Sequence, residues 1–198
     1  MVVTEHLPIK DTINIMAQAH RSQVTVIGPN TPGIIVPDKC KLGIMPAEVF
    51  SPGSVGVVSR SGTLTYEIAE SLTHKGFGQS ACVGVGGDPV VGLNLIEALK
   101  QFKKHSGTEA VVLIGEIGGN IEEITAEYIT KESYPKPVVA YVAGRFAPSG
   151  KRMGHAGAIV MGKRGTAESK VEAFKNANVN VAEKPSDVAS LLKKALLR

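Results

Sequence analysis

One histidine of this chain lies in a setting that suits chemistry on an anion. His155 stands in the motif Gly154-His155-Ala156-Gly157, so backbone without side chains lies close to it on both sides. A histidine that only fills a core needs no such neighbours, whereas one that meets a bulky anion does. The alternative is a tight turn in which the histidine is incidental, because short motifs often match by chance. The basic pairs Lys151-Arg152 and Lys163-Arg164 bracket the loop, and positive charge here suits phosphate.

A carboxylate follows an apolar run elsewhere in the chain, in Gly115-Glu116-Ile117-Gly118-Gly119. An isolated buried glutamate is costly unless it is paired, so Glu116 requires a basic partner, and His155 is the candidate. A carboxylate on one imidazole nitrogen fixes the tautomer and raises the nucleophilicity of the other nitrogen. The alternative is that Glu116 points into solvent at the end of a strand.

A hydroxyl-rich turn, Ser59-Arg60-Ser61-Gly62-Thr63, lies between an apolar run and a helical pattern. Backbone N–H groups at a helix start and the positive end of the helix dipole attract anions, and the hydroxyls of Ser61 and Thr63 are further donors. Ser61, Gly62 and Thr63 are therefore candidate phosphate-binding residues. The alternative is ordinary N-capping of the helix.

The elements expected around these motifs indicate a parallel sheet. Residues 9–21 have helical spacing, residues 24–27 are expected to form a short buried strand, and residues 28–54 are expected to be loop-rich. Short apolar strands then alternate with amphipathic helices. The strands are expected at 55–58, 81–85, 110–114, 137–143 and 179–182, and the helices at about 62–75, 92–104, 121–131, 166–176 and 185–197. This alternation predicts an α/β fold with a doubly wound parallel sheet, similar to flavodoxin, whose function gathers at the carboxyl ends of the strands.

Composition excludes several classes of function. Hydrophobic residues make up 43% of the 198 positions and charged residues 20%, which argues against disorder, and no apolar run is long enough to cross a membrane. A net charge of +4 with few aromatic residues argues against nucleic-acid binding as the function. Cys40 and Cys82 lie far apart and fit reduced, mostly structural thiols. No histidine, cysteine or acidic group has metal-ligand spacing, and Asp88 is expected to bind backbone rather than to catalyse.

Five motifs, in order and over nearly the whole chain, closely resemble those of succinyl-CoA synthetase α subunits. They are Gly28-Pro29-Asn30-Thr31-Pro32-Gly33 and residues 59–67, 84–89, 115–119 and 151–159. The resemblance implies that His155 becomes phosphohistidine and that Glu116 holds it. It also implies substrate binding by Tyr66, receipt of the phosphate by Ser61, Gly62 and Thr63, and contact of Val3, Thr4 and Glu5 with coenzyme A.

The same resemblance implies a reaction and a partner. In the family reaction, phosphate displaces coenzyme A from succinyl-CoA, succinyl phosphate phosphorylates the histidine, and the histidine loop passes the group to a nucleoside diphosphate. The nucleotide, ATP or GTP, and its Mg²⁺ belong to a β subunit, in a heterodimer or heterotetramer. The expected compartment is the cytoplasm of a bacterium or archaeon, or the mitochondrial matrix, with no membrane partner.

The resemblance also divides the chain. Residues 1–27 are expected to be a remnant of a Rossmann-type CoA-binding domain, residues 28–54 a connecting segment, and residues 55–198 the ligase domain. Because most of the CoA-binding domain is expected to be absent, apolar surface should be exposed over residues 2–27. Two alternatives stay open: a non-catalytic truncated paralogue that keeps the fold and the subunit interface, and a related acid:CoA ligase acting on malate or another acid.

Overall fold

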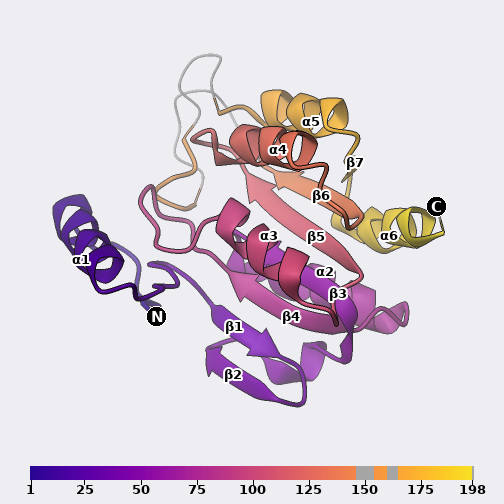
Figure 1. The fold of residues 1–198 in the computed structure, drawn as a ribbon, viewed down its shortest axis with the longest axis horizontal. Coiled ribbons are helices and arrows are strands. Elements are labelled where there is room, and N and C mark those ends of the chain that lie inside the picture. The colour runs from indigo at the N-terminus through magenta and orange to yellow at the C-terminus, as the bar shows by residue number, and fades with distance from the viewer. Residues whose placement is uncertain (146–153, 160–164, 198) are drawn as a thin grey trace.

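The computed structural model describes residues 1–145, 154–159 and 165–197 (Figure 1). The basic pairs predicted to bracket the histidine loop, Lys151-Arg152 and Lys163-Arg164, lie outside these residues. The described strands form one 7-stranded sheet in the order β2-β1-β4-β3-β5-β6-β7. Their bounds are Gly33–Val36 (β1), Cys40–Gly43 (β2), Pro52–Ser59 (β3), Gln79–Gly84 (β4), Ala110–Glu116 (β5), Val138–Ala143 (β6) and Asn180–Ala182 (β7).

Five of these strands pair in parallel with their neighbours. Their order in the sheet is β4-β3-β5-β6-β7. This is the order of a flavodoxin-like sheet, so the predicted fold class is confirmed. Every residue of β5 is buried, because helices cover both faces of the sheet. That double burial explains why the strands read as continuous apolar runs rather than as alternating patterns.

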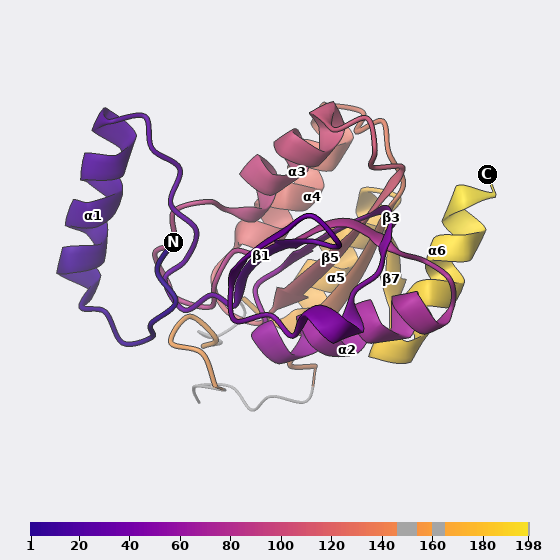
Figure 2. The same ribbon diagram turned by 90° about the horizontal axis from the view of Figure 1, so that it is seen from below.

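Helices form a layer on each face of the sheet (Figures 1 and 2). The helices α3 (Leu95–Lys104), α4 (Ile121–Lys131) and α5 (Ala167–Asn176) pack on one face around Val58, Leu99 and Phe174. On the other face, α2 (Gly62–His74) and α6 (Val188–Leu196) pack around Val57, Ile68 and Leu192. Short 3-10 turns span Ala47–Val49 and Pro185–Asp187. None of the described helices combines the length and apolar character that crossing a bilayer requires.

Two helices begin later in the structure than the sequence predicted, because local turns and capping bonds set their first residues. The helix expected from residue 92 begins instead at Leu95, because the Asn94 side chain accepts from the Glu97 amide and the Glu97 carboxylate accepts from the Asn94 amide. This capping box fixes the start of α3. The helix expected from residue 185 begins at Val188, after the Pro185–Asp187 turn.

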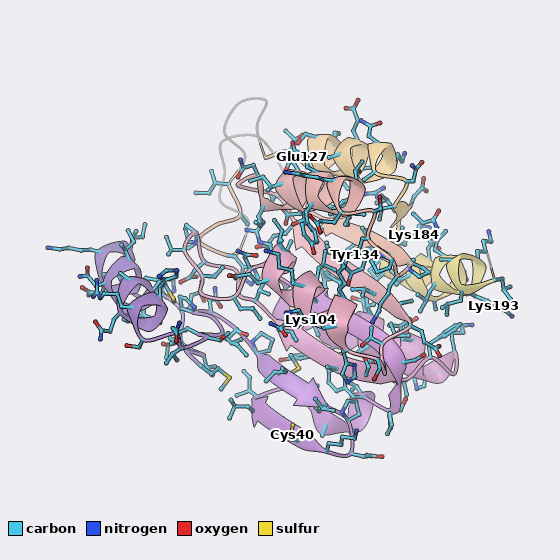
Figure 3. The ribbon with its side chains drawn as sticks, viewed as in Figure 1. Cys40, Lys104, Glu127, Tyr134, Lys184 and Lys193 are labelled. Carbon is cyan, nitrogen blue, oxygen red and sulfur yellow. The ribbon has the colours of Figure 1, made fainter. Side chains whose placement is uncertain are left out.

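The loop expected over residues 28–54 was wrong in part, because this segment carries a hairpin. Strands β1 and β2 pair antiparallel, and β1 also pairs antiparallel with β4, so the sheet is mixed rather than purely parallel. Gly33 and Gly43 lie opposite each other at positive φ, and a Cβ on either would lie within 2.3 Å of a backbone oxygen. Each strand has only four residues, too short for a periodicity to show. Cys40 lies exposed on β2 (Figure 3), whereas Cys82 is buried in β4; both are free thiols.

The buried strand expected at residues 24–27 was also wrong. These residues have no strand geometry, and Val24 is 58% exposed. Residues 1–4 instead run beside them: the Val2 amide donates to the Ile27 carbonyl (2.9 Å) and the Asn30 amide to the Thr4 carbonyl (3.0 Å). Isolated bonds of this kind do not extend into a ladder. Helix α1 (Ile9–Arg21) precedes this segment and stands apart from the sheet in both views (Figures 1 and 2).

Candidate functional site

The predicted histidine and carboxylate lie in direct contact. His155 Nδ1 is 2.8 Å from Glu116 Oε2, and the two side chains are 27% and 8% exposed. Glu116 is the last residue of β5, so the sheet itself sets the position of its carboxylate. An ionised carboxylate accepts from the Nδ1–H tautomer, which leaves the lone pair on Nε2. The hydrogen bond that Nδ1–H donates to Glu116 raises the pKa of His155 above its usual value, against the opposing effect of burial.

Glycines on the neighbouring turns make room for the imidazole. A Cβ on Gly87, which follows β4, would lie 2.3 Å from both Cγ and Nδ1 of His155. The Gly157 amide donates to the Gly87 carbonyl (3.1 Å), so the histidine loop rests on this turn. Gly118 has φ +89° and a Cβ there would lie 1.9 Å from the Gly157 carbonyl oxygen. The sequence predicted a close-packed turn after β4 but not that His155 packs against it.

Arg60 lies behind Glu116 and was not singled out from the sequence. Its side chain is 8% exposed, and Nη2 lies 3.4 Å from Glu116 Oε1. Its Nη1 donates to Glu122 Oε1 (2.8 Å). The same Glu122 oxygen accepts the Glu116 backbone N–H (3.1 Å). Arg60 therefore lies between two buried carboxylates, one of which holds the histidine.

Glu122 and Lys170 extend this buried group of charges into the helix layer. Both side chains are 0% exposed, and Lys170 Nζ donates to Glu122 Oε2. Lys170 also donates to Glu123 Oε2 (2.9 Å) and to the Gly119 carbonyl (3.1 Å). Burial acts to raise the pKa of Glu122, but Arg60 and Lys170 outweigh it and hold that pKa below the usual value. In the sequence, a glutamate on the buried face of α4 was the one available signal for this group.

The start of α2 has the geometry of a capped helix. Ser61 Oγ accepts from the Leu64 amide (3.4 Å), and the Ser61 amide donates to Ser59 Oγ (3.0 Å). The N-capping interpretation of Ser61 is thus confirmed, and its own amide is already bonded. Gly62 is half-buried and Thr63 is exposed. Phosphate binding by these three residues stays a prediction.

The remaining predicted site residues, Tyr66 and residues 3–5, differ in how deeply they are buried. Tyr66 is half-buried, packs against the apolar cluster under α2 and α6, and has a pKa raised by burial. Val3 is half-buried and Thr4 exposed. Glu5 is exposed, yet it is near enough for its charge to raise the pKa of His155, although less than Glu116 does. The segment expected to touch coenzyme A therefore approaches the histidine.

Asn30 joins that segment to the turn under the histidine. Its amide nitrogen donates to the Thr4 carbonyl, and its own carbonyl accepts from the Gly87 amide (3.2 Å). Its side-chain Nδ2 donates to Asp88 Oδ1 (3.1 Å). The expectation that Asp88 binds backbone was wrong in this respect, because its partner is a side chain from a segment 58 residues earlier.

Described side chains do not gather into a metal site: no three histidine, cysteine or acidic residues among them are arranged to hold an ion. The arrangement can instead present one imidazole nitrogen as a nucleophile, with a carboxylate to orient the ring and balance its charge.

Sequence comparison places this arrangement among known ligases. The pattern of the CoA-ligase family matches residues 58–180. The chain is 55% identical over 196 residues to the succinate–CoA ligase (ADP-forming) subunit alpha of Methanothermobacter thermautotrophicus, covering 99% of this chain and 66% of that protein. It is 53% identical to subunit alpha 2 of the same enzyme from Archaeoglobus fulgidus, covering 98% and 67%. The chain thus spans about two thirds of the length of these curated relatives.

Solved structures share the fold over nearly the whole chain. An ATP citrate lyase of Methanosaeta concilii in complex with (3S)-citryl-CoA superposes with a TM-score of 0.90 at 26% identity, covering 98% of this chain and 33% of that one. The ATP citrate lyase of Methanothrix soehngenii, in complex with citrate and coenzyme A, gives 0.86 at 26% identity, covering 100% and 35%. A dinucleotide-forming acetyl-coenzyme A synthetase from Ca. Korarchaeum cryptofilum, at 22% identity and a TM-score of 0.74, shares the fold.

Proposed function

The chain belongs to the CoA-ligase family, and on that premise we propose that it is the α-subunit part of a succinate–CoA ligase, with His155 as the phosphoryl carrier. One observation carries the proposal: the contact between His155 Nδ1 and Glu116 Oε2 at 2.8 Å, on a loop bounded by glycines. Identities of 55% and 53% to succinate–CoA ligase subunits, against 26% to ATP citrate lyases, favour succinate over citrate as the acid.

The proposed reaction proceeds by transfer of one phosphoryl group. Phosphate attacks the thioester carbonyl of succinyl-CoA, so that coenzyme A leaves as the thiol and succinyl phosphate forms. The Nε2 lone pair of His155 then attacks phosphorus, and succinate leaves with the electron pair of the broken P–O bond. Glu116 accepts from Nδ1–H throughout, which balances the positive charge that develops on the ring. A nucleoside diphosphate takes the phosphoryl group in the last step.

The other predicted residues fit around this transfer. The start of α2, with Gly62 and Thr63 next to the Ser61 cap, would hold the phosphate through backbone N–H groups. Tyr66 would contact the acid, and residues 3–5 would contact coenzyme A beside the histidine. Residues 1–27 would then belong to the CoA-binding part, residues 28–54 to a connection that also supplies the edge hairpin, and residues 55–198 to the ligase part.

A partner subunit completes the proposal. The relatives are named as subunits alpha, and we infer that this chain acts with a β subunit that binds ADP or GDP with Mg²⁺, in a heterodimer or heterotetramer. Free thiols at Cys40 and Cys82 fit a reducing compartment, the cytoplasm of a prokaryote in the first instance.

Phosphorylation of the reconstituted complex tests the proposal. We would mix the chain with a β subunit, Mg²⁺ and γ-labelled nucleoside triphosphate, and measure label on this chain that is labile in acid and stable in base. His155→Ala should remove the label, whereas His105→Ala, which changes an exposed histidine bonded to Thr108, should leave it unchanged. An unchanged label in His155→Ala would contradict the assignment. A complex that forms without label would instead indicate a non-catalytic paralogue.

A further inference from the structure

We propose that Arg60 is a positioning residue for the histidine: it holds the Glu116 carboxylate against His155, and Glu122 and Lys170 hold Arg60 in turn. The inference rests on the proposed phosphoryl transfer at His155 and names residues that this transfer needs behind the two reacting partners. Among the described residues, the ion pairs of Arg60 are with Glu116 and Glu122, so its effect on the histidine passes through Glu116.

The first support is the geometry of the Arg60 guanidinium. Nη2 lies 3.4 Å from Glu116 Oε1, while Nη1 donates to the carbonyls of Glu116 (3.3 Å) and Gly118 (3.2 Å). One planar fork therefore holds both the carboxylate and the backbone of the turn that carries it. A lysine ammonium is a point charge and does not reproduce this spread of contacts.

The second support is the charge balance around Glu116. Its Oε2 binds His155, and its buried Oε1 makes no hydrogen bond among the described residues, so Arg60 is the cation that faces it. The second buried carboxylate, Glu122, accepts the Glu116 backbone amide and pairs with Nη1 of the same guanidinium (2.8 Å). Arg60 is thus the cation shared by two buried carboxylates, each of which is costly to bury without a positive partner.

The third support is that Arg60 is itself fixed from behind. Lys170, on α5, has a side chain with 0% exposure and donates to Glu122, to Glu123 and to the Gly119 carbonyl. A buried lysine is rare and costly unless its donors are satisfied, and here all three of its contacts converge on the first turn of α4 and the turn before it. Charges alternate from His155 through Glu116, Arg60, Glu122 and Lys170 to Glu123. We call this series the charge row.

A simpler interpretation is that the charge row only holds α4 and α5 on the sheet. The two interpretations differ in what happens to His155 when Arg60 is changed. Among the described residues, the charged groups that act on His155 are Glu116 and Glu5, which raise its pKa, and Arg60, which lowers it by its own charge. If Arg60 is only a nearby charge, its removal raises the pKa of His155. If Arg60 positions Glu116, its removal frees the carboxylate, and the pKa of His155 falls towards about 6.5.

The experiment follows the His155 ring by NMR titration in the full chain, with His155→Ala to assign the signal. We would compare the wild type with Arg60→Gln and Arg60→Lys, and use Arg145→Gln as the control. Arg145, which lies just after β6, is a half-buried arginine that donates to the carbonyl of Ala182 at the end of β7. We expect the His155 pKa to fall in Arg60→Gln, to fall less in Arg60→Lys, and to stay unchanged in the control.

Phosphorylation gives the second readout, in the complex with the β subunit. Misplacement of a reacting group by about 1 Å lowers rates about 100-fold, so we expect labelling to slow about 10- to 100-fold in Arg60→Gln. A His155 pKa that rises or stays unchanged in folded Arg60→Gln would overturn the proposal. If Arg60→Gln does not fold, Arg60→Lys decides: wild-type labelling and pKa would overturn it. Absence of label in the wild type would refute the proposed function, while the titration would still test Arg60.

Discussion

The imidazole of His155 is defined by two neighbours of opposite kind. Glu116 places a carboxylate oxygen 2.8 Å from Nδ1, and Gly87, which has no side chain, leaves space for the same ring. The carboxylate selects the tautomer, and the glycine permits the ring to reach it. In the proposed reaction, both are needed for Nε2 to act as the nucleophilic nitrogen.

Gly87→Ala tests the second of these neighbours. The added Cβ would lie 2.3 Å from the ring, so we expect it to displace His155 from Glu116, to abolish most of the phosphohistidine label and to destabilise the fold by about 1–3 kcal/mol. Labelling and urea unfolding measure the two effects. The matched control is Gly107→Ala, whose Cβ would meet the exposed His105 ring at 2.9 Å and which should leave both unchanged. Full labelling in Gly87→Ala would show that the ring has another way to reach Glu116.

Sequence reasoning found some of these residues and missed others for a physical reason. His155 and Glu116 stand out because glycines flank one and a strand end carries the other, and both signals are local. Arg60 and Lys170 have no local signal, and Glu122 has only its place on the buried face of α4, since a buried charge is recognised only with its partner. Arg60 and Glu122 are 62 positions apart and Glu122 and Lys170 are 48 apart, so the pattern of a local stretch of sequence cannot reveal these contacts.

At the scale of elements, each strand end or helix start around the site carries a different residue of the site. Strand β5 carries Glu116, the turn after β4 carries Gly87, and α2 begins at Gly62, directly after the Arg60-Ser61 pair. The parallel strands were predictable because burial on both faces makes them continuous apolar runs. The hairpin of β1 and β2 was not, because β1 also pairs with the distant strand β4, as between Ile34 and Val83, and this pairing leaves no mark on the local pattern.

Ser61→Ala tests whether the start of α2 does more than cap its helix. Loss of the bond from the Leu64 amide should cost about 1 kcal/mol of unfolding free energy. Thr166→Ala is the matched control, because Thr166 caps α5 in the same way by accepting from the Ser169 amide (3.1 Å). If α2 also receives the phosphate, only Ser61→Ala should slow labelling, by about tenfold or more. Equal labelling in the two variants would show that Ser61 caps the helix and does not contribute to phosphate binding.

At the scale of the whole molecule, the sheet with its two helix layers is one body and α1 projects from it (Figure 2). A groove of about 610 Å³ lies between them, lined by residues of α1 and α3 such as Met16 and Lys100 and by residues of the adjoining segments such as Val24 and Leu93. Ile9 and Ile13, one turn apart on α1, are 57% and 51% exposed. The exposed apolar surface expected over residues 2–27 is thus present at these positions and at Val24.

This surface should make the isolated chain associate. We expect the sedimentation coefficient to rise with concentration, because burying exposed isoleucines on one helix face is favourable. The double substitution Ile9→Gln and Ile13→Gln should reduce that dependence. Leu42→Gln, which removes an equally exposed side chain (56%) from β2, serves as the control. A chain that sediments as a monomer at all concentrations would contradict the expectation.

The charge row has a consequence for how this sequence can change over generations. Besides His155, its members come from β5, α4, α5 and the residue after β3, so selection on one histidine extends to charged residues that contact one another inside the protein. The loss of one member leaves its neighbour buried and unpaired, which makes the cost of a second loss depend on the first. Arg60, Glu122 and Lys170 should therefore be inherited as a set, and substitutions among them should be epistatic rather than additive.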